Sequence, residues 1–185
     1  MRHLHRKLRE NHHLKFDGRV QYRLFLKGLG FTVQDSLLFF RDEFTRIIPT
    51  AKFDREYAYH IRHSYGLEGS RKDYAPMDCE KIIHGAAPRH GQYHGCPFKH
   101  WDTAALNAEL RRAGVSAPDD ATRITRLAAS GHPQAACTAL FTALHGQRHA
   151  ADGDGGGGRG GGGAMHPNEW VHSSWNLTVK NTNNC

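Results

Sequence analysis

Four cysteines are the side chains of this sequence best suited to bind a metal, and they lie far apart along the chain. They are Cys79, Cys96, Cys137 and Cys185, and no two of them form a CxxC pair. The N-terminal run MRHLHRKLRE lacks the apolar core of a signal peptide, so we expect a reducing, intracellular environment. Widely spaced cysteines are there more often metal ligands or free thiols than disulfides. Their spacing alone leaves both interpretations open.

A second chemical group consists of nitrogen donors that bracket a turn and a helix start near the N-terminus. Its members are His13, Lys15, Arg19 and Lys27. Arginine offers a forked pair of donors to phosphate, lysine offers a compact charge, and a helix N-terminus adds the positive end of its dipole. The group therefore predicts a phosphate-binding site, with a solvated basic helix face as the alternative.

Aromatic and cationic side chains alternate in a third group, over residues 57–63. Its members are Tyr57, Tyr59, His60, Arg62 and His63. Rings that stack on bases, next to cations that face the backbone, suit single-stranded nucleic acid. Tyr57 is also in helical register with Phe53 and Ile61. It could therefore be a core residue instead.

The overall charge favours a polyanionic partner. The chain has 25 Lys and Arg against 18 Asp and Glu, which gives a net charge of +7. It also has 15 histidines but no HExxH motif, so we expect histidines to contact phosphates and bases. The alternative is a basic domain with scattered lysines. No apolar run approaches a membrane span, so we expect no membrane partner.

Apolar periodicity and helix breakers predict the elements that would position these groups. We expect helices over residues 1–10, 19–29, 33–48, 53–64, 79–83, 102–113, 118–129 and 133–145. Thr32 followed by Asp35 predicts a capping box. No strand pattern of any length competes with these helices. The predicted fold is mostly α, a compact helical domain with long loops around the cysteines and little or no sheet.

The length of 185 residues suits one domain with a single core. We expect residues 1–150 to form its main body and the glycine-rich residues 151–164 to form a disordered insertion. Residues 165–175, which contain HPNEW, should complete the domain, and residues 176–185 should be a frayed tail.

Several runs, taken in order, resemble one family. They are MRHLHRKLRENHHLKFDGRVQYRLFLKGLG, FDREYAYHIRHSYGLEGSRKDYAPMDCEKII, YHGCPFKH, AACTALF and HPNEW. Together they resemble the C-terminal domain of the large subunit of eukaryotic-type DNA primases. The resemblance covers about residues 1–170, interrupted by the glycine-rich run.

The resemblance implies a [4Fe–4S] cluster held by four cysteines, because a cubane takes one ligand for each iron. Cys79, Cys96 and Cys137 match three of these ligands. The family's first cysteine falls immediately ahead of the segment that begins with Met1, so we expect the chain as written to bind a cluster poorly or in a labile three-cysteine form. Cys185 lies beyond the matching region and is not expected to be the fourth ligand.

The resemblance also implies a nucleic-acid site. His13, Arg19 and Lys27 match positions that hold the 5′-triphosphate of the RNA primer, whereas Phe16 departs from a position at which the family often has histidine. Tyr22 matches a family tyrosine near this site, with packing between helices as its alternative. Residues 57–63 resemble the surface that contacts the template near the primer's 5′ end.

The implied activity is accessory, with no catalytic residue in this chain. The one DxD run, at residues 152–154, lies in the glycine-rich insertion, so nucleotide addition is expected from the primase small subunit. The domain would act in the nucleus within the primosome, supporting primer initiation, length control and transfer to the DNA polymerase alpha complex. One rival is a zinc-binding nucleic-acid module that uses the three cysteines and a histidine. A flavin enzyme is a second rival, but the sequence has no nucleotide-binding fingerprint to support it.

Overall fold

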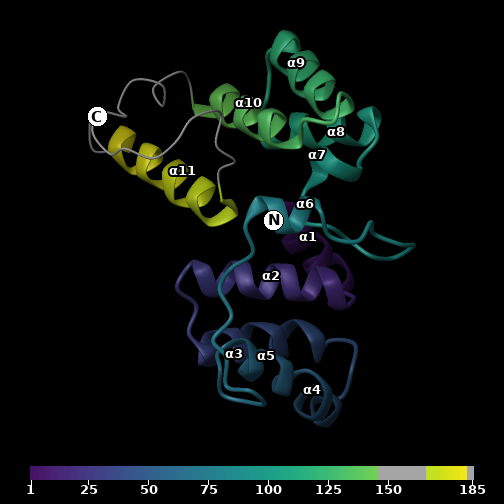
Figure 1. Ribbon diagram of the computed structural model, residues 1–185, viewed down its shortest axis with the longest axis vertical. Coiled ribbons are helices and arrows are strands. Elements are labelled where there is room, and N and C mark those ends of the chain that lie inside the picture. Colours follow the sequence, from purple (N-terminus) through teal and green to yellow (C-terminus); the bar gives the residue numbers. More distant parts are fainter. Residues whose placement is uncertain (146–165, 183–185) are drawn as a thin grey trace. The chain divides into compact units, whose positions relative to one another are not determined.

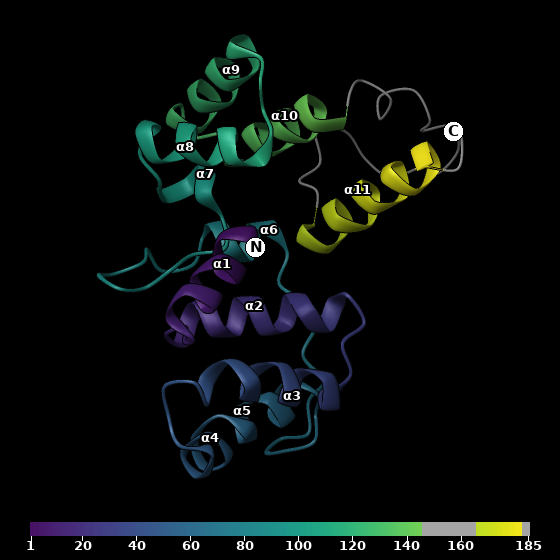
Figure 2. The same ribbon diagram turned by 180° about the vertical axis from the view of Figure 1, so that it is seen from behind.

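The computed structural model describes residues 1–145 and 166–182, and the regular structure in these residues is helical (Figures 1 and 2). Beside the helices they contain one isolated β-bridge, between Tyr65 and Asp73. The prediction of a mostly α fold is confirmed. The helices are α1 (Arg2–Asn11), α2 (Phe16–Gly28), α3 (Val33–Phe44), α4 (Thr50–Glu56), α5 (Ala58–Ser64), α6 (Cys79–Ile83), α7 (Pro97–His100), α8 (Thr103–Ala113), α9 (Pro118–Ala129), α10 (Pro133–His145) and α11 (Pro167–Thr182). No helix in the described ranges is long and apolar enough to cross a membrane.

The described chain forms two compact units. The first unit consists of Met1–Asp78 and Gly85–Gly95, and the second consists of Cys79–His84 and Cys96–Cys185. Each unit buries its own set of side chains: leucines together with aromatic rings in the first, and mainly aliphatic side chains in the second. Hydrophobic periodicity reports which residues are buried along a helix but not which helices share a core.

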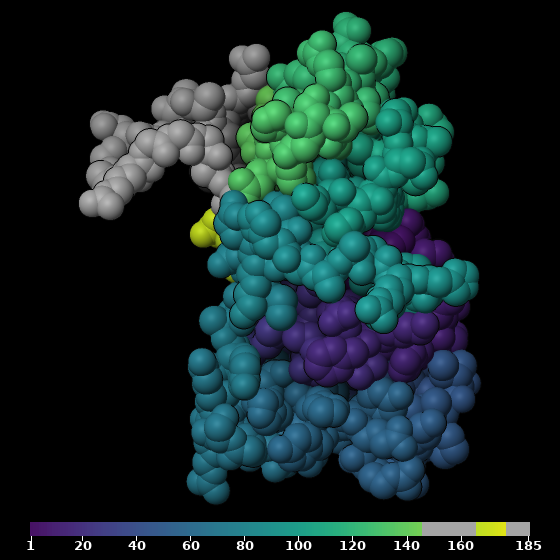
Figure 3. Space-filling view, turned by 45° about the vertical axis from the view of Figure 1, so that its right-hand side comes forward, coloured from purple at the N-terminus to yellow at the C-terminus, as the bar shows by residue number. Residues whose placement is uncertain are grey.

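Phenylalanines form the core of the first unit. Phe40 and Phe44 of α3 and Phe53 of α4 are almost fully buried, and Phe44 meets both other rings edge-on at centroid distances of 5.8 and 5.9 Å. The predicted capping box between Thr32 and Asp35 starts α3 and is confirmed. On the face shown in Figure 3, residues of α1 and α2 (purple) directly abut those of the following helices (blue).

A buried carboxylate ties α3 to the end of α1. The side chain of Glu43 is fully buried, accepts a hydrogen bond from Arg9 of α1 and lies 3.0 Å from Nδ1 of His12. His12 ends α1 in the left-handed conformation, with φ of 50°. The carboxylate therefore fixes the turn that leads from α1 to His13.

We expect the Glu43→Ala substitution to lower the free energy of unfolding by about 3 kcal/mol, because it leaves two nitrogen donors facing a buried gap. Asp42→Ala is the matched control: Asp42 is exposed on the same helix and pairs with Arg46 at 3.2 Å. Its loss should cost about 0.5 kcal/mol or less. Urea denaturation of both variants measures the difference, and equal losses would contradict the anchoring role of Glu43.

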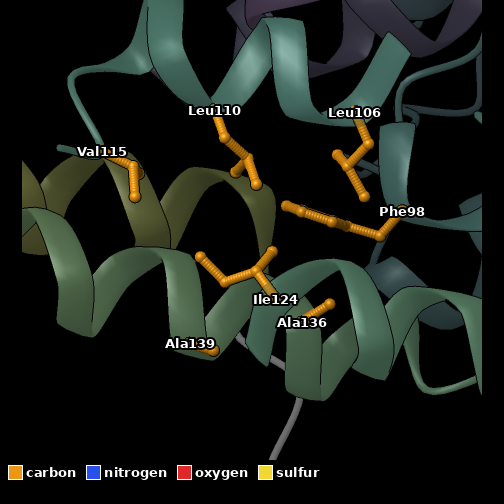
Figure 4. Close-up of a cluster of buried hydrophobic side chains, with 7 residues drawn as sticks. All are labelled: Phe98, Leu106, Leu110, Val115, Ile124, Ala136 and Ala139. Carbon is orange, nitrogen blue, oxygen red and sulfur yellow. The ribbon is translucent and has the colours of Figure 1, made fainter. Parts of the chain in front are cut away.

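The second unit is built on α8, α9 and α10, with α7 beside them (Figure 1). Its core consists of Phe98, Leu106, Leu110, Val115, Ile124, Ala136 and Ala139. The ring of Phe98 extends between the side chain of Leu106 on one side and those of Ile124 and Ala136 on the other (Figure 4). Asp102 caps α8 by accepting a hydrogen bond from the backbone N–H of Ala105 at 2.8 Å.

Helix boundaries differ from the predicted ones in several places. α3 ends at Phe44 rather than at residue 48. α2 begins at Phe16 rather than at residue 19, and the helix predicted over residues 53–64 is divided at Tyr57 into α4 and α5. The short helix α7 was not predicted. α11 continues to Thr182, where a frayed tail was expected from residue 176, and its Trp170 ring packs edge-on against Phe141 of α10 at 5.2 Å. The glycine-rich residues 151–164 and Cys185 lie outside the described residues.

Candidate nucleic-acid interface and cysteine site

Two arginines of α2 line a hollow in the first unit. Arg19 and Arg23 stand one helical turn apart, so their side chains leave the same face of α2. We call this hollow the arginine pocket; it is lined by Arg19, Arg23, Phe40, Phe44, Tyr57 and Ile61. The pocket lining therefore combines two arginine side chains with aromatic rings.

Arg19 is held at the pocket by its backbone neighbours and by rings. Its Nη1 donates to the carbonyl of Leu14 at 2.8 Å, and its guanidinium lies 4.9 Å from the ring centre of Tyr57 and 5.9 Å from that of Phe16. Phe16 is 58% exposed, so the residue that departs from the family pattern lies beside Arg19 at the surface. Burial lowers the pKa of Arg19, and the Tyr57 phenol partly offsets this.

Arg23 is a site residue that the sequence reasoning missed. Its side chain is almost completely buried, with 6% of the residue exposed, and its Nε donates to Oγ of Ser64 at 2.8 Å. Burial, and then the charge of Arg19, lower its pKa to about 10. The signal for Arg23 was present in the sequence, because it follows Arg19 by four residues on a helix that was already predicted.

The positive charges of the pocket arginines also act on two histidines, His13 and His60. Nε2 of His13 is 3.3 Å from the Tyr57 hydroxyl, and the His13 ring packs against Phe44 at 5.0 Å. Burial, and then the positive charges of Arg19 and neighbouring lysines, lower the pKa of His13. Burial, and then Arg23 and Arg19, lower the pKa of His60. His13, Arg19, Tyr57 and His60 are therefore brought together, although the sequence analysis assigned them to two separate groups.

A small aromatic surface is formed by two residues of α5 and one residue that follows it. Tyr59, which is 40% exposed, lies 6.0 Å from the ring of His63, and His63 lies 5.2 Å from the ring of Tyr74. Tyr74 was not selected from the sequence, because it lies outside the alternating run. Arg62 is engaged in an ion pair with Glu68 at 2.6 Å.

Three further residues of the predicted site serve mainly as internal contacts. The Lys27 ammonium donates to the carbonyls of Ser64 and Tyr74 and to the carboxylate of Asp73, at 2.5–3.0 Å, which uses all three of its N–H groups. Tyr22 is 3% exposed, and its hydroxyl is 2.7 Å from Nδ1 of His5, as the packing alternative predicted. Lys15 is exposed and donates to the carbonyl of His90 at 3.1 Å.

The three cysteines that match the family all lie in the second unit. Cys79 begins α6, Cys96 immediately precedes α7, and Cys137 lies within α10. A hydrogen bond of 2.7 Å from Nε2 of Gln134 to Oε1 of Glu80 joins α10 to α6 next to two of these cysteines. Cys96 and Cys137 both pack against the core of this unit.

The three thiols act on one another electrostatically. Burial raises the pKa of Cys96, and burial together with Cys79 and Cys96 raises the pKa of Cys137 to about 12. Within the described residues, no three His, Cys, Asp or Glu side chains are grouped as a single metal ion requires. A four-iron cubane binds one thiolate at each corner and so accepts ligands that are spread more widely than those of one ion. Three thiols are the type of donor that iron–sulfur clusters take.

Comparison of the sequence with known proteins assigns the chain to a family. Residues 1–171 match the model of a family described as the C-terminal domain of the eukaryotic and archaeal DNA primase large subunit. The matched range contains both arginines of the pocket and all three cysteines.

Curated relatives agree with the family model. The chain is 43% identical to the probable DNA primase large subunit of Arabidopsis thaliana over 98% of its length, 47% identical to the DNA primase large subunit of Homo sapiens over 78%, and 40% identical to that of Saccharomyces cerevisiae over 77%. It spans 37%, 28% and 27% of the lengths of these three relatives. The chain therefore belongs to the family of the C-terminal domain of the eukaryotic and archaeal DNA primase large subunit.

Proposed function

We propose that this chain binds the template strand and the 5′-triphosphate end of the initiating nucleotide and of the RNA primer. The observation that carries the proposal is the cluster of His13, Arg19, Arg23 and His60 around the arginine pocket. In the part of the chain that the structure describes, the charges that act on these four groups are those of arginines, lysines, histidines and tyrosines, and no carboxylate is among them. Two arginine charges without a carboxylate counter-charge favour a polyanion, and the two histidines add further hydrogen-bonding groups.

The template strand would lie on the aromatic surface formed by Tyr59, His63 and Tyr74. The exposed ring of Tyr59 and the partly exposed rings of His63 and Tyr74 offer stacking platforms to unpaired bases. The neighbouring His60 is under the electrostatic influence of Arg23 and Arg19. Lys27 and Arg62 support this surface from within, because both hold the segment of residues 64–74 that carries Tyr74. Their removal should therefore act through the position of that segment.

The same domain would hold a [4Fe–4S] cluster through Cys79, Cys96 and Cys137 and a fourth ligand. When bound, the cluster would act as a structural cross-link between α6, the start of α7 and α10. The thiols would bind as thiolates, so their raised pKa values in the metal-free protein mean that binding releases protons.

The family resemblance implies that the fourth ligand is a cysteine immediately ahead of Met1. The amino group of Met1 donates to the carbonyl of Gly95 at 3.2 Å, and Gly95 is the residue before Cys96. A residue joined ahead of Met1 would thus lie beside the residue that precedes Cys96. This agrees with the family resemblance, which expects a cysteine there.

Nucleotide addition would take place on the primase small subunit, with this chain as the accessory part of the complex. By keeping hold of the primer's 5′ end, the domain would support initiation, limit primer length and present the primer to the DNA polymerase alpha complex. These roles place it in the nucleus.

Binding of a primer–template junction should weaken steeply with salt, because each phosphate contact releases counterions. We expect log K against log salt concentration to fall with a slope of about −3 or steeper, which corresponds to roughly four contacts. Fluorescence anisotropy between low and moderate salt measures the slope, and Arg19→Ala should make it shallower by about 1. A flat salt response would contradict a phosphate-binding surface.

A further inference from the structure

Arg23 carries a buried positive charge that no carboxylate in the described part of the first unit neutralises. Its hydrogen-bond partner is the Ser64 hydroxyl through Nε, which leaves the N–H groups of Nη1 and Nη2 unused in the described residues. The phenol of Tyr65 is the group that favours its charge, whereas burial and Arg19 oppose it. Neither Arg23 nor Arg19 forms an ion pair with a carboxylate of the described chain.

This arrangement costs stability in the free protein. Charged side chains are almost never fully buried unless they are paired, because the charged form loses its hydration. Here the cost is increased by a second arginine one turn away on the same helix, lining the same pocket. A counter-ion supplied from outside would remove both penalties at once.

We propose that Arg23 is a further anion-binding residue of the arginine pocket, which acts behind Arg19 on the terminal phosphate chain of the bound nucleic acid. The inference rests on the proposed function and extends it to a specific residue. Arg19 is the more exposed of the two arginines, so a phosphate group that enters the pocket contacts Arg19 first. The forked N–H groups of Arg23 are the next donors along the same face of α2. The shared chemistry is a polyphosphate, on an RNA 5′ end or free in solution.

The alternative is that Arg23 is only a structural link between α2 and Ser64 of α5. The two roles make opposite predictions for Arg23→Met, which keeps the volume of the side chain and removes its charge. A structural link would be lost, so the thermal midpoint of unfolding would fall. An anion-binding residue carries an unpaired charge, so its removal leaves the midpoint unchanged or raises it, while binding weakens. Ser64 keeps its hydrogen bond to the carbonyl of His60, at 3.2 Å, in either case.

The test uses the full 185-residue chain and two RNA-primed template junctions, with a 5′-triphosphate or a 5′-hydroxyl. We expect Arg23→Met to weaken binding of the triphosphate junction by about tenfold and of the hydroxyl junction by less than about twofold. Arg23→Lys keeps the charge without the fork and should lose roughly threefold on the triphosphate junction. Arg46→Met, at a half-exposed arginine paired with Asp42, is the matched control and should change neither affinity.

Inorganic tripolyphosphate distinguishes the phosphate chain from the rest of the junction. It should raise the thermal midpoint of the wild-type chain, and the rise should be much smaller in Arg23→Met, whose own midpoint is not lowered. Unchanged triphosphate affinity in Arg23→Met, or a lowered midpoint with equal losses on both junctions, would overturn the inference for Arg23. If Arg19→Ala still abolishes discrimination in that case, the proposed function stands. If the wild-type chain does not discriminate between the junctions, the proposed function itself fails.

Discussion

Arg19→Ala should weaken binding of a 5′-triphosphate junction by about 30-fold, or ~2 kcal/mol, because a hydrogen-bonded charge contributes roughly that much. The loss on a 5′-hydroxyl junction should be about threefold or less, since only backbone phosphates are then left to interact with the pocket. The guanidinium is fixed between the carbonyl of Leu14 and the ring of Tyr57, so little order has to be gained when the anion binds. Titration of both junctions by fluorescence anisotropy gives the two ratios.

Two controls separate recognition from damage to the fold. Arg46→Ala removes a half-exposed arginine that pairs with Asp42 on α3 and should leave both affinities unchanged. The thermal midpoint of Arg19→Ala should fall only modestly, because the lost hydrogen bond to the Leu14 carbonyl is offset by removal of a mostly buried charge that has no carboxylate partner in the described residues. Equal losses on the two junctions would show that Arg19 does not recognise the triphosphate.

When the chain is reconstituted with iron and sulfide in the absence of oxygen, the Cys137→Ser substitution should abolish most of the visible absorption of the iron–sulfur cluster. Cys137 is under the electrostatic influence of the other two thiols, as a ligand of a shared cluster would be. A serine hydroxyl is a poor substitute for a thiolate as a cluster ligand. Iron and acid-labile sulfide per chain, together with the visible spectrum, measure the loss.

Two comparisons make this result specific to the cluster. Cys185→Ser should leave the iron content unchanged, because that residue lies beyond the matching segment. A chain with one cysteine added ahead of Met1 should bind more iron and keep it longer in air, since the amino group of Met1 contacts Gly95 next to Cys96. A colourless product that takes up zinc but no iron, with or without the added cysteine, would contradict the cluster assignment.

The helices were largely predictable from the sequence because their signals are local. Residues 79–83, 118–129 and 133–145 were predicted with the bounds that the structure shows, each helped by a proline or a clear apolar period. The break between α4 and α5 was not predictable from periodicity. The apolar spacing of Phe53, Tyr57 and Ile61 continues through Tyr57, whose own backbone ends one helix and begins the next.

The residue types of the candidate site were predictable from the sequence, but the contacts that each side chain makes were not. The sequence alone predicts that the Lys27 ammonium is available to bind phosphate. In the structure it donates to Ser64, Asp73 and Tyr74, which lie more than 35 positions away along the chain and approach it only after folding. Tyr22 is likewise enclosed by α1 and α3, against His5 and Phe40. Arg23 was overlooked for the opposite reason, because a charged residue within a predicted helix is ordinarily solvent-exposed.

The most direct test of the proposed function is the affinity of the wild-type chain for two junctions that differ only at the primer's 5′ end. At fixed salt, the 5′-triphosphate junction should bind at least about tenfold more tightly than the 5′-hydroxyl junction, because added phosphates meet cations that have no counter-charge among the described residues. Equal affinities for the two junctions would contradict the proposal that this domain holds the triphosphate end of the primer.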